Sequence, residues 1–136
     1  MGSHITPSQP MDKRTILEEI VESVRARLEQ EKARVPLAEV RAKAQDSDSP
    51  LNFQDALESK GDEVCIIAEA KRASPSAGLI AESYDPVALA RAYEAGGAAA
   101  LSVLTEPQYF LCELDHLSRI RKAVSLPILR KDFTID

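Results

Sequence analysis

The side chains best suited to chemistry are Glu69 and Lys71, which follow the short apolar run at residues 64–67, a pattern typical of a buried strand. Because they lie two residues apart, strand alternation predicts that they share a face at the carboxyl end of this strand. Charged groups in such a place are costly unless they are paired or solvated in a pocket. Since α/β folds build active sites at strand carboxyl ends, the pair is either a structural ion pair or part of such a site.

A third predicted strand, at residues 126–133, repeats this feature. Alternation places Lys131 and Phe133 on one face, and Arg130 and Asp132 on the other. Arg130 and Asp132 have a simpler interpretation as a solvated strand end. Charged groups at the ends of two strands nevertheless favour a shared site, in which two lysines would form a cationic pocket for an anionic substrate.

Helices and strands alternate in the part of the chain that must position these residues. An amphipathic helix is predicted at residues 12–34, with cap candidates at Asp12 and at Thr15, which has Glu18 at the capping-box spacing. Asp85-Pro86 predicts a helix start. The elements expected after it are a helix ended by Gly96-Gly97, a strand at 98–105, a helix at 113–124 and the strand at 126–133. This alternation predicts parallel strands, and the lack of a G-x-G-x-x-G sequence favours part of a barrel over a dinucleotide-binding domain.

Composition excludes several classes of function. The net charge is −5, so no basic field invites nucleic acid, and no apolar run approaches the ~20 residues of a membrane span. No secretory signal is recognisable, which predicts a cytoplasmic protein. Cys65 and Cys112 lack metal-ligand spacing, and His4 and His116 are the only histidines. Two reduced thiols and no metal site are therefore expected.

Three stretches together resemble one known family, the indole-3-glycerol phosphate synthases, which are (β/α)8-barrel enzymes of tryptophan biosynthesis. The first stretch is IAEAKRASPS at 67–76, which GLI at 78–80 follows. The second is AGGAAALSVLTE at 95–106, and the third is LPILRKDF at 126–133. They occur in the order of the family, and the resemblance covers residues 53–136.

The resemblance implies an α/β fold of the TIM-barrel family, here with only the amino-terminal helical extension and the first three strands. The expected division is a tag remnant at residues 1–10, the extension at 11–60 and the first βαβαβ portion of the barrel at 61–136. The family's later strands carry its general base and phosphate-binding loops. The chain by itself is therefore expected to be inactive and to self-associate.

The resemblance also implies roles for three charged residues. Lys131 is the general acid that drives ring closure, Lys71 contacts the anionic groups of the substrate, and Glu69 holds the lysines in place and assists proton transfer. The implied substrate is 1-(2-carboxyphenylamino)-1-deoxyribulose 5-phosphate, which loses carbon dioxide and water to give indole-3-glycerol phosphate. No metal or organic cofactor is implied.

Substrate binding is assigned by the same resemblance to Ser74, Phe110 and Phe133. Ser74 helps to bind the substrate carboxylate, and the two phenylalanines flank its aromatic ring. The sequence departs from the family at Cys112-Glu113, where a Gly-Ser pair is usual, which affects the loop that carries Phe110. Two alternatives remain open: another barrel enzyme that binds ribulose phosphates, and a non-catalytic barrel fragment that self-associates. The expected partner is a small phosphorylated molecule, without nucleic acid or membrane.

Overall fold

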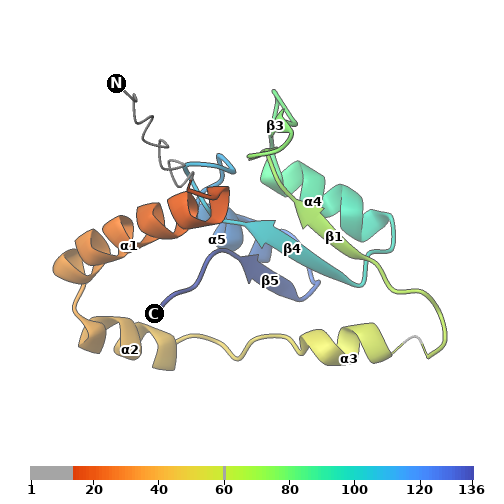
Figure 1. Ribbon diagram of the computed structural model, residues 1–136. Helices are drawn as coiled ribbons and strands as arrows, with labels where there is room; N and C mark the ends of the chain where they lie inside the picture. Colours follow the sequence, from red (N-terminus) through yellow and green to blue (C-terminus); the bar gives the residue numbers. More distant parts are fainter. Residues whose placement is uncertain (1–13, 60) are drawn as a thin grey trace, which may run out of the picture.

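Three parallel strands form one sheet in the computed structural model, which describes residues 14–59 and 61–136 (Figure 1). The predicted tag at 1–10 and the cap candidate Asp12 lie outside the described residues. The helices are α1 Ile16–Arg34, α2 Leu37–Gln45, α3 Phe53–Glu58, α4 Pro86–Ala95 and α5 Asp115–Arg121. The strands are β1 Ile67–Ala70, β2 Ala73–Ser74, β3 Gly78–Leu79, β4 Ala100–Leu104 and β5 Ile128–Lys131. The sheet order is β1-β4-β5, which confirms the predicted α/β class and parallel pairing.

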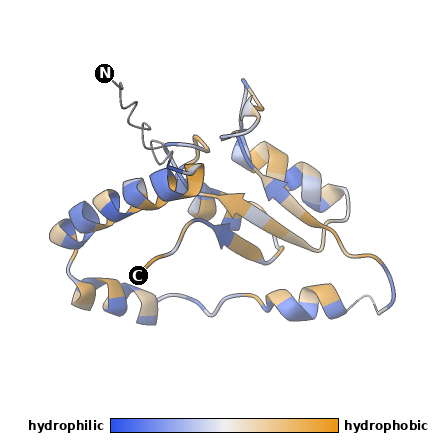
Figure 2. Cartoon of the chain, viewed as in Figure 1, coloured by the Kyte–Doolittle hydropathy of each residue, from blue (hydrophilic) through white to orange (hydrophobic). Residues whose placement is uncertain are grey.

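The core lies between this sheet and the two helices that connect its strands. β4 is the central strand, and all of its residues are buried. Small residues of β1 and large ones of β4 pack against α4 and α5, and this cluster contains Ala68, Ala70, Ala90, Leu101, Val103, Ile120 and Val124. Figure 2 shows apolar residues along β4 and polar residues at the carboxyl end of β5. Packing on one face therefore leaves the other face of the sheet to carry the charged residues.

Two of the capping residues predicted from the sequence are confirmed, although α1 begins at Ile16, four residues after the predicted start of its helix. Thr15 caps α1 and forms the full capping box with Glu18, and the Asp85 carboxylate accepts from two amides at the start of α4. Gly97, just after α4, has φ 87°, a conformation in which a β-carbon would be strained. None of the helices in the described part of the chain is long and apolar enough to cross a membrane.

The burial predicted for the apolar run before β1 is wrong. Val64 and Ile66 are 90% and 60% exposed, and the strand begins only at Ile67. The backbone of Ile66 is nevertheless anchored, because its carbonyl accepts the Ala99 amide at 2.8 Å. An apolar run predicts burial only where another element covers it, and here the described residues provide no such cover.

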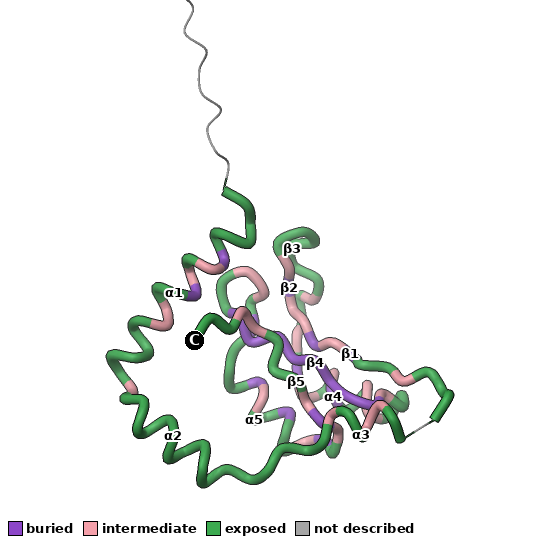
Figure 3. The backbone as a smooth tube through the Cα atoms, turned by 60° about the horizontal axis from the view of Figure 1, so that its bottom comes forward, coloured by how far each residue is buried: buried purple, intermediate pink, exposed green. Residues whose placement is uncertain are grey.

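The helices that precede the sheet differ in how closely they pack. In α1, Ile20 and Val24 are buried, whereas α2 has no buried residue, as Figure 3 shows along its length. Ile16 and Leu17, two apolar residues in the first turn of α1, are about half exposed. The middle of α1 is therefore the part that is buried against the rest of the chain.

Candidate active site

A single carboxylate joins the two lysines that the sequence singled out. Glu69, on β1, pairs through Oε1 with Lys71 Nζ at 2.8 Å and through Oε2 with Lys131 Nζ at 3.3 Å. The three side chains are partly exposed, so they are open to a ligand. The structure thus brings together the three residues for which acid–base roles were predicted, and those roles themselves stay predictions.

Ionisation of Glu69 follows from this pairing. Partial burial raises the pKa of its carboxyl, but hydrogen bonds from Lys71 and Lys131 outweigh burial and leave the pKa below its ordinary value of 4.5. At neutral pH, Glu69 is therefore a carboxylate that can only accept hydrogen bonds. Each lysine forms one ion pair with it and keeps donors for another anion.

Strand register explains why these side chains meet. Glu69 pairs with Ser102 of β4, and Lys131 pairs with Leu104 two residues further along the same strand. All of them project from the face opposite to α4 and α5, because side chains at equivalent register positions share a face. Tyr93 of α4 also fixes β1 here, since its hydroxyl donates to the Glu69 carbonyl oxygen at 3.1 Å.

Two aromatic rings lie beside each other at the strand ends. The ring centroids of Phe110, from the loop after β4, and Phe133, after β5, are 6.2 Å apart, with their planes at 40°. The Phe110 carbonyl accepts the Ala73 amide at 3.1 Å, which ties this loop to the segment after β1. Cys112, the first residue at which the sequence departs from the family, is fully buried. The residue before it, Leu111, has φ 53°. The structure brings together the two phenylalanines to which a ring-flanking role was assigned.

Ser74 lies in a short antiparallel hairpin made by β2 and β3. Its hydroxyl oxygen accepts the Ala77 amide at 3.1 Å and lies 3.4 Å from the Ser76 hydroxyl. Among the described residues, no hydrogen bond or ion pair joins Ser74 to Glu69 or to the lysines. It is therefore placed on a separate element close in sequence to β1, and its predicted contact with the substrate stays a prediction.

Two buried carboxylates that accept backbone amides of the aromatic pair were not among the predicted site residues. The side chains of Glu106 and Asp132 are 0% and 3% exposed, and Arg27 of α1 pairs with both. Asp132 also accepts from the Thr105 hydroxyl at 2.7 Å and pairs with Arg130 at 3.1 Å. The interpretation of Asp132 as part of a solvated strand end is thus wrong, because α1 covers it. The sequence signal was a carboxylate within two residues of the end of each of two strands.

The ionised state of Asp132 is stabilised by these partners. Burial raises the pKa of its carboxyl, but hydrogen bonds from Thr105, Arg130 and the Phe133 amide outweigh burial and lower the pKa below 3.8. The charge of Asp132 is therefore part of the folded structure at neutral pH.

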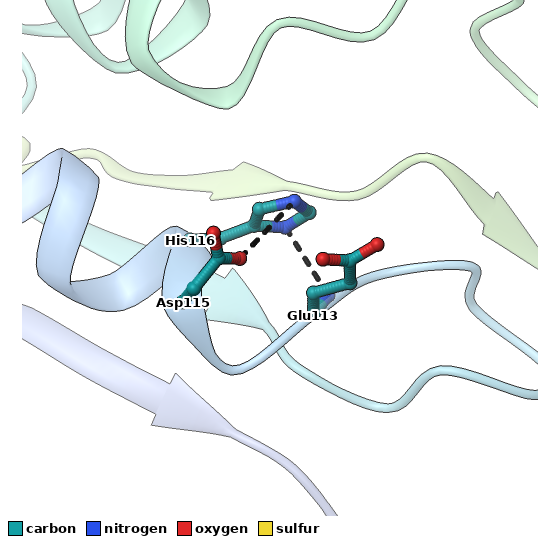
Figure 4. Close-up of side chains that lie close together, drawn as sticks. All are labelled: Glu113, Asp115 and His116. Carbon is teal, nitrogen blue, oxygen red and sulfur yellow. Dashed lines mark hydrogen bonds and ion pairs between the residues drawn. The ribbon is translucent and has the colours of Figure 1, made fainter.

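A group with possible metal ligands, Glu113, Asp115 and His116, lies at the start of α5 (Figure 4). Burial lowers the pKa of His116, so its imidazole is neutral at pH 7. Its Nδ1 accepts the Glu113 amide at 3.2 Å, which leaves the hydrogen on Nε2, 4.0 Å from Asp115. A metal ion needs an unprotonated ring nitrogen, so this arrangement fits a helix-start hydrogen bond better than a metal site.

A cleft of about 500 Å³ lies between α1 and the segment that follows β5. Arg27, Arg130, Asp132 and Phe133 are among the residues that line it. The cleft thus shares Phe133 with the aromatic pair, whereas Glu69 and the two lysines lie outside its lining.

Comparisons with known proteins agree on one family. Residues 17–136 match the family model described as indole-3-glycerol phosphate synthase. Proteins with that name from Mycolicibacterium gilvum and Rhodospirillum rubrum are each 50% identical to the chain, over 125 and 123 residues. The protein from Rhodopirellula baltica is 49% identical over 122 residues. These matches cover 92%, 89% and 90% of the chain but 45%, 47% and 47% of the relatives, so the chain spans about half their length.

Proposed function

The chain belongs to the indole-3-glycerol phosphate synthase family, and we propose that the protein containing it catalyses the reaction for which the family is named. The substrate is 1-(2-carboxyphenylamino)-1-deoxyribulose 5-phosphate. A carbon of its aromatic ring bonds to the ketone carbon, after which carbon dioxide and water leave to give indole-3-glycerol phosphate. The observation that carries this proposal is the bridge from Glu69 to Lys71 and Lys131 at the carboxyl end of the sheet.

The three parallel strands are proposed to be the first three of a (β/α)8 barrel. The order β1-β4-β5 supports this, because successive parallel strands are neighbours in such a barrel. The charged face carrying Glu69 and Lys131 would then point into the barrel, at the end where TIM barrels bind substrates. In the same scheme, α1 is the amino-terminal extension.

Lys131 is the proposed general acid. Its ammonium forms an ion pair with Glu69 and has donors left for the substrate ketone oxygen, on which negative charge develops as the ring bond forms. Protonation of that oxygen prepares its later loss as water. Glu69, being ionised, holds the ammonium groups in place and assists proton transfer, while Lys71 binds an anionic group of the substrate.

Phe110 and Phe133 are proposed to flank the aromatic ring of the substrate. Their centroid separation of 6.2 Å supports a common apolar wall next to the charged groups. Ser74 is proposed to bind the substrate carboxylate through its hydroxyl, which still has a hydrogen to donate because the Ala77 amide uses only a lone pair.

The proposal is tested with the protein at its natural length. Formation of indole-3-glycerol phosphate from the synthetic substrate is followed by fluorescence, with Lys131→Ala as the test variant and Lys122→Ala as the control. Lys122 is exposed at the end of α5, away from the site. We expect activity in the wild type and in the control, and its loss in Lys131→Ala. Normal turnover by Lys131→Ala would remove its catalytic role, and turnover of another ribulose phosphate instead would assign a different barrel enzyme.

A further inference from the structure

Arg27 connects helix α1 to both sides of the aromatic pair. Its guanidinium lies 3.7 Å from Glu106 Oε1 and 3.5 Å from Asp132 Oδ1, and these carboxylates follow β4 and β5, respectively. Both carboxylates are buried, whereas the Arg27 side chain is 31% exposed. A single cation from the extension thus lies between two buried anions, in a place where charge interactions are weakly screened by solvent.

Each of these carboxylates also fixes the backbone of one phenylalanine. Glu106 Oε2 accepts the amides of Tyr109 at 2.6 Å and Phe110 at 3.2 Å. Asp132 Oδ1 accepts the amide of Phe133 at 2.9 Å. The chain of contacts therefore runs from Phe110 through Glu106, Arg27 and Asp132 to Phe133, and the two rings lie at its ends.

The two ends of this chain of contacts depend on Arg27 to different degrees. Asp132 has a second cation, Arg130, and the Thr105 hydroxyl. In the described part of the chain, Glu106 forms an ion pair with Arg27 alone, and its other partners are backbone amides. Loss of the Arg27 charge should therefore loosen the Phe110 loop more than the segment carrying Phe133.

We propose that Arg27 is a positioning residue that sets the spacing between Phe110 and Phe133 and thereby the affinity for the aromatic part of the substrate. The kinetic part of this inference rests on the proposed function. Arg27 touches neither the reacting atoms nor the two lysines. Its effect reaches the substrate only through the backbone positions of the two rings.

Fluorine NMR tests the structural step without any need for turnover. Para-fluorophenylalanine is incorporated in the natural-length protein at position 110, 133 or 53, the last on α3 as an internal reference. Arg27→Met keeps an unbranched stem, two atoms shorter than that of arginine, and removes the charge. Arg25→Met, on an exposed position of the same helix, is the matched control. We expect Arg27→Met to shift or broaden the signal from position 110 strongly and that from 133 weakly, and to leave that from 53 unchanged.

Steady-state kinetics test the consequence for binding. Arg27→Met should raise KM about tenfold with kcat within about twofold, because the rings contact the substrate in the ground state and the transition state alike. Arg27→Lys, which keeps a charge but has no fork to reach both carboxylates, should lie between the wild type and Arg27→Met.

The outcomes separate this inference from the proposed function. A wild type without synthase activity would contradict the function, while the NMR signals would still show whether Arg27 positions the rings. An active enzyme in which Arg27→Met and Arg25→Met have the same spectra and the same KM would overturn the inference. If Arg27→Met does not fold, Arg27→Lys decides in the same way: an unchanged KM and an unchanged signal at position 110 would contradict the proposal.

Discussion

Glu69 on β1 and Lys131 on β5 form an ion pair of 3.3 Å although β4 separates their strands. The register partner of Glu69 on β4 is Ser102, which is buried and lies on the same face. A small side chain at this position lets the carboxylate extend over the central strand. The site thus depends on a residue that itself makes no charged contact.

Enlargement of Ser102 should break this ion pair. In Ser102→Leu, the added carbon atoms would occupy the space over β4 that the carboxylate of Glu69 crosses, and we expect kcat/KM to fall at least tenfold, on the order expected for displaced catalytic groups. Ser102→Ala is the matched control, because it removes the hydroxyl and leaves the space. Equal activity of the leucine and alanine variants would show that the Glu69–Lys131 contact is dispensable.

The ion pairs of Glu69 should contribute to stability in a defined range of pH. Although burial opposes it, the hydrogen bonds from Lys71 and Lys131 lower the folded-state pKa below 4.5, so the folded state favours the ionised form. The contribution is therefore fully present above pH 4.5 and is lost as the pH falls through the folded pKa. Carbon-detected NMR titration of the Glu69 carboxyl checks this. We expect a pKa below the ordinary value in the wild type and a higher one in Lys131→Met; the same pKa in both would contradict the pairing.

Replacement of Asp132 by asparagine should destabilise the fold. The carboxylate accepts from Thr105, Arg130 and the Phe133 amide, and an amide side chain supplies one acceptor oxygen in place of two. We expect the free energy of unfolding to fall by about 1–3 kcal/mol at pH 7, measured by urea denaturation.

This loss should shrink in acid, because the lowered pKa of Asp132 means that its contribution is present above pH 3.8 and disappears as the carboxyl takes up a proton. Asp62→Asn, in an exposed turn, is the control. A loss that is the same for both variants would show that the buried network has no net effect on stability.

A polypeptide of these 136 residues should self-associate. Ile67 and Leu129 are 46% and 49% exposed on the face of the sheet that carries the charged site, and covering one such side chain is worth about 1.5–3 kcal/mol. In the described residues, β1 and β5 also each have an unpaired edge, which can pair with another chain. Sedimentation should detect dimers or larger species, and Ile67→Glu should weaken them. A stable monomer at all concentrations would contradict this prediction, and an active one would also contradict the expected inactivity of the chain alone.

Local patterns in the sequence were enough to predict much of this architecture. The period of two in a strand placed Glu69 and Lys71 on one face, and the structure pairs them at 2.8 Å. Capping residues such as Thr15 and Asp85 predicted where helices begin. Alternation of helices with strands predicted a parallel sheet. Strand faces and helix caps depend on residues a few positions apart, and the parallel sheet follows from the order of the elements along the chain, so the sequence alone could determine these features.

Only the tertiary structure decided which residues from different elements meet and which are covered. Burial of Asp132 depends on α1 lying over the end of β5, and exposure of Val64 depends on the absence of a covering element among the described residues. The contacts of Glu69 with Lys131 and of Arg27 with Glu106 join strands and helices far apart in the chain. Burial and charge pairing are set by distances in space, which follow from strand register and helix packing, and local periodicity carries no information about either.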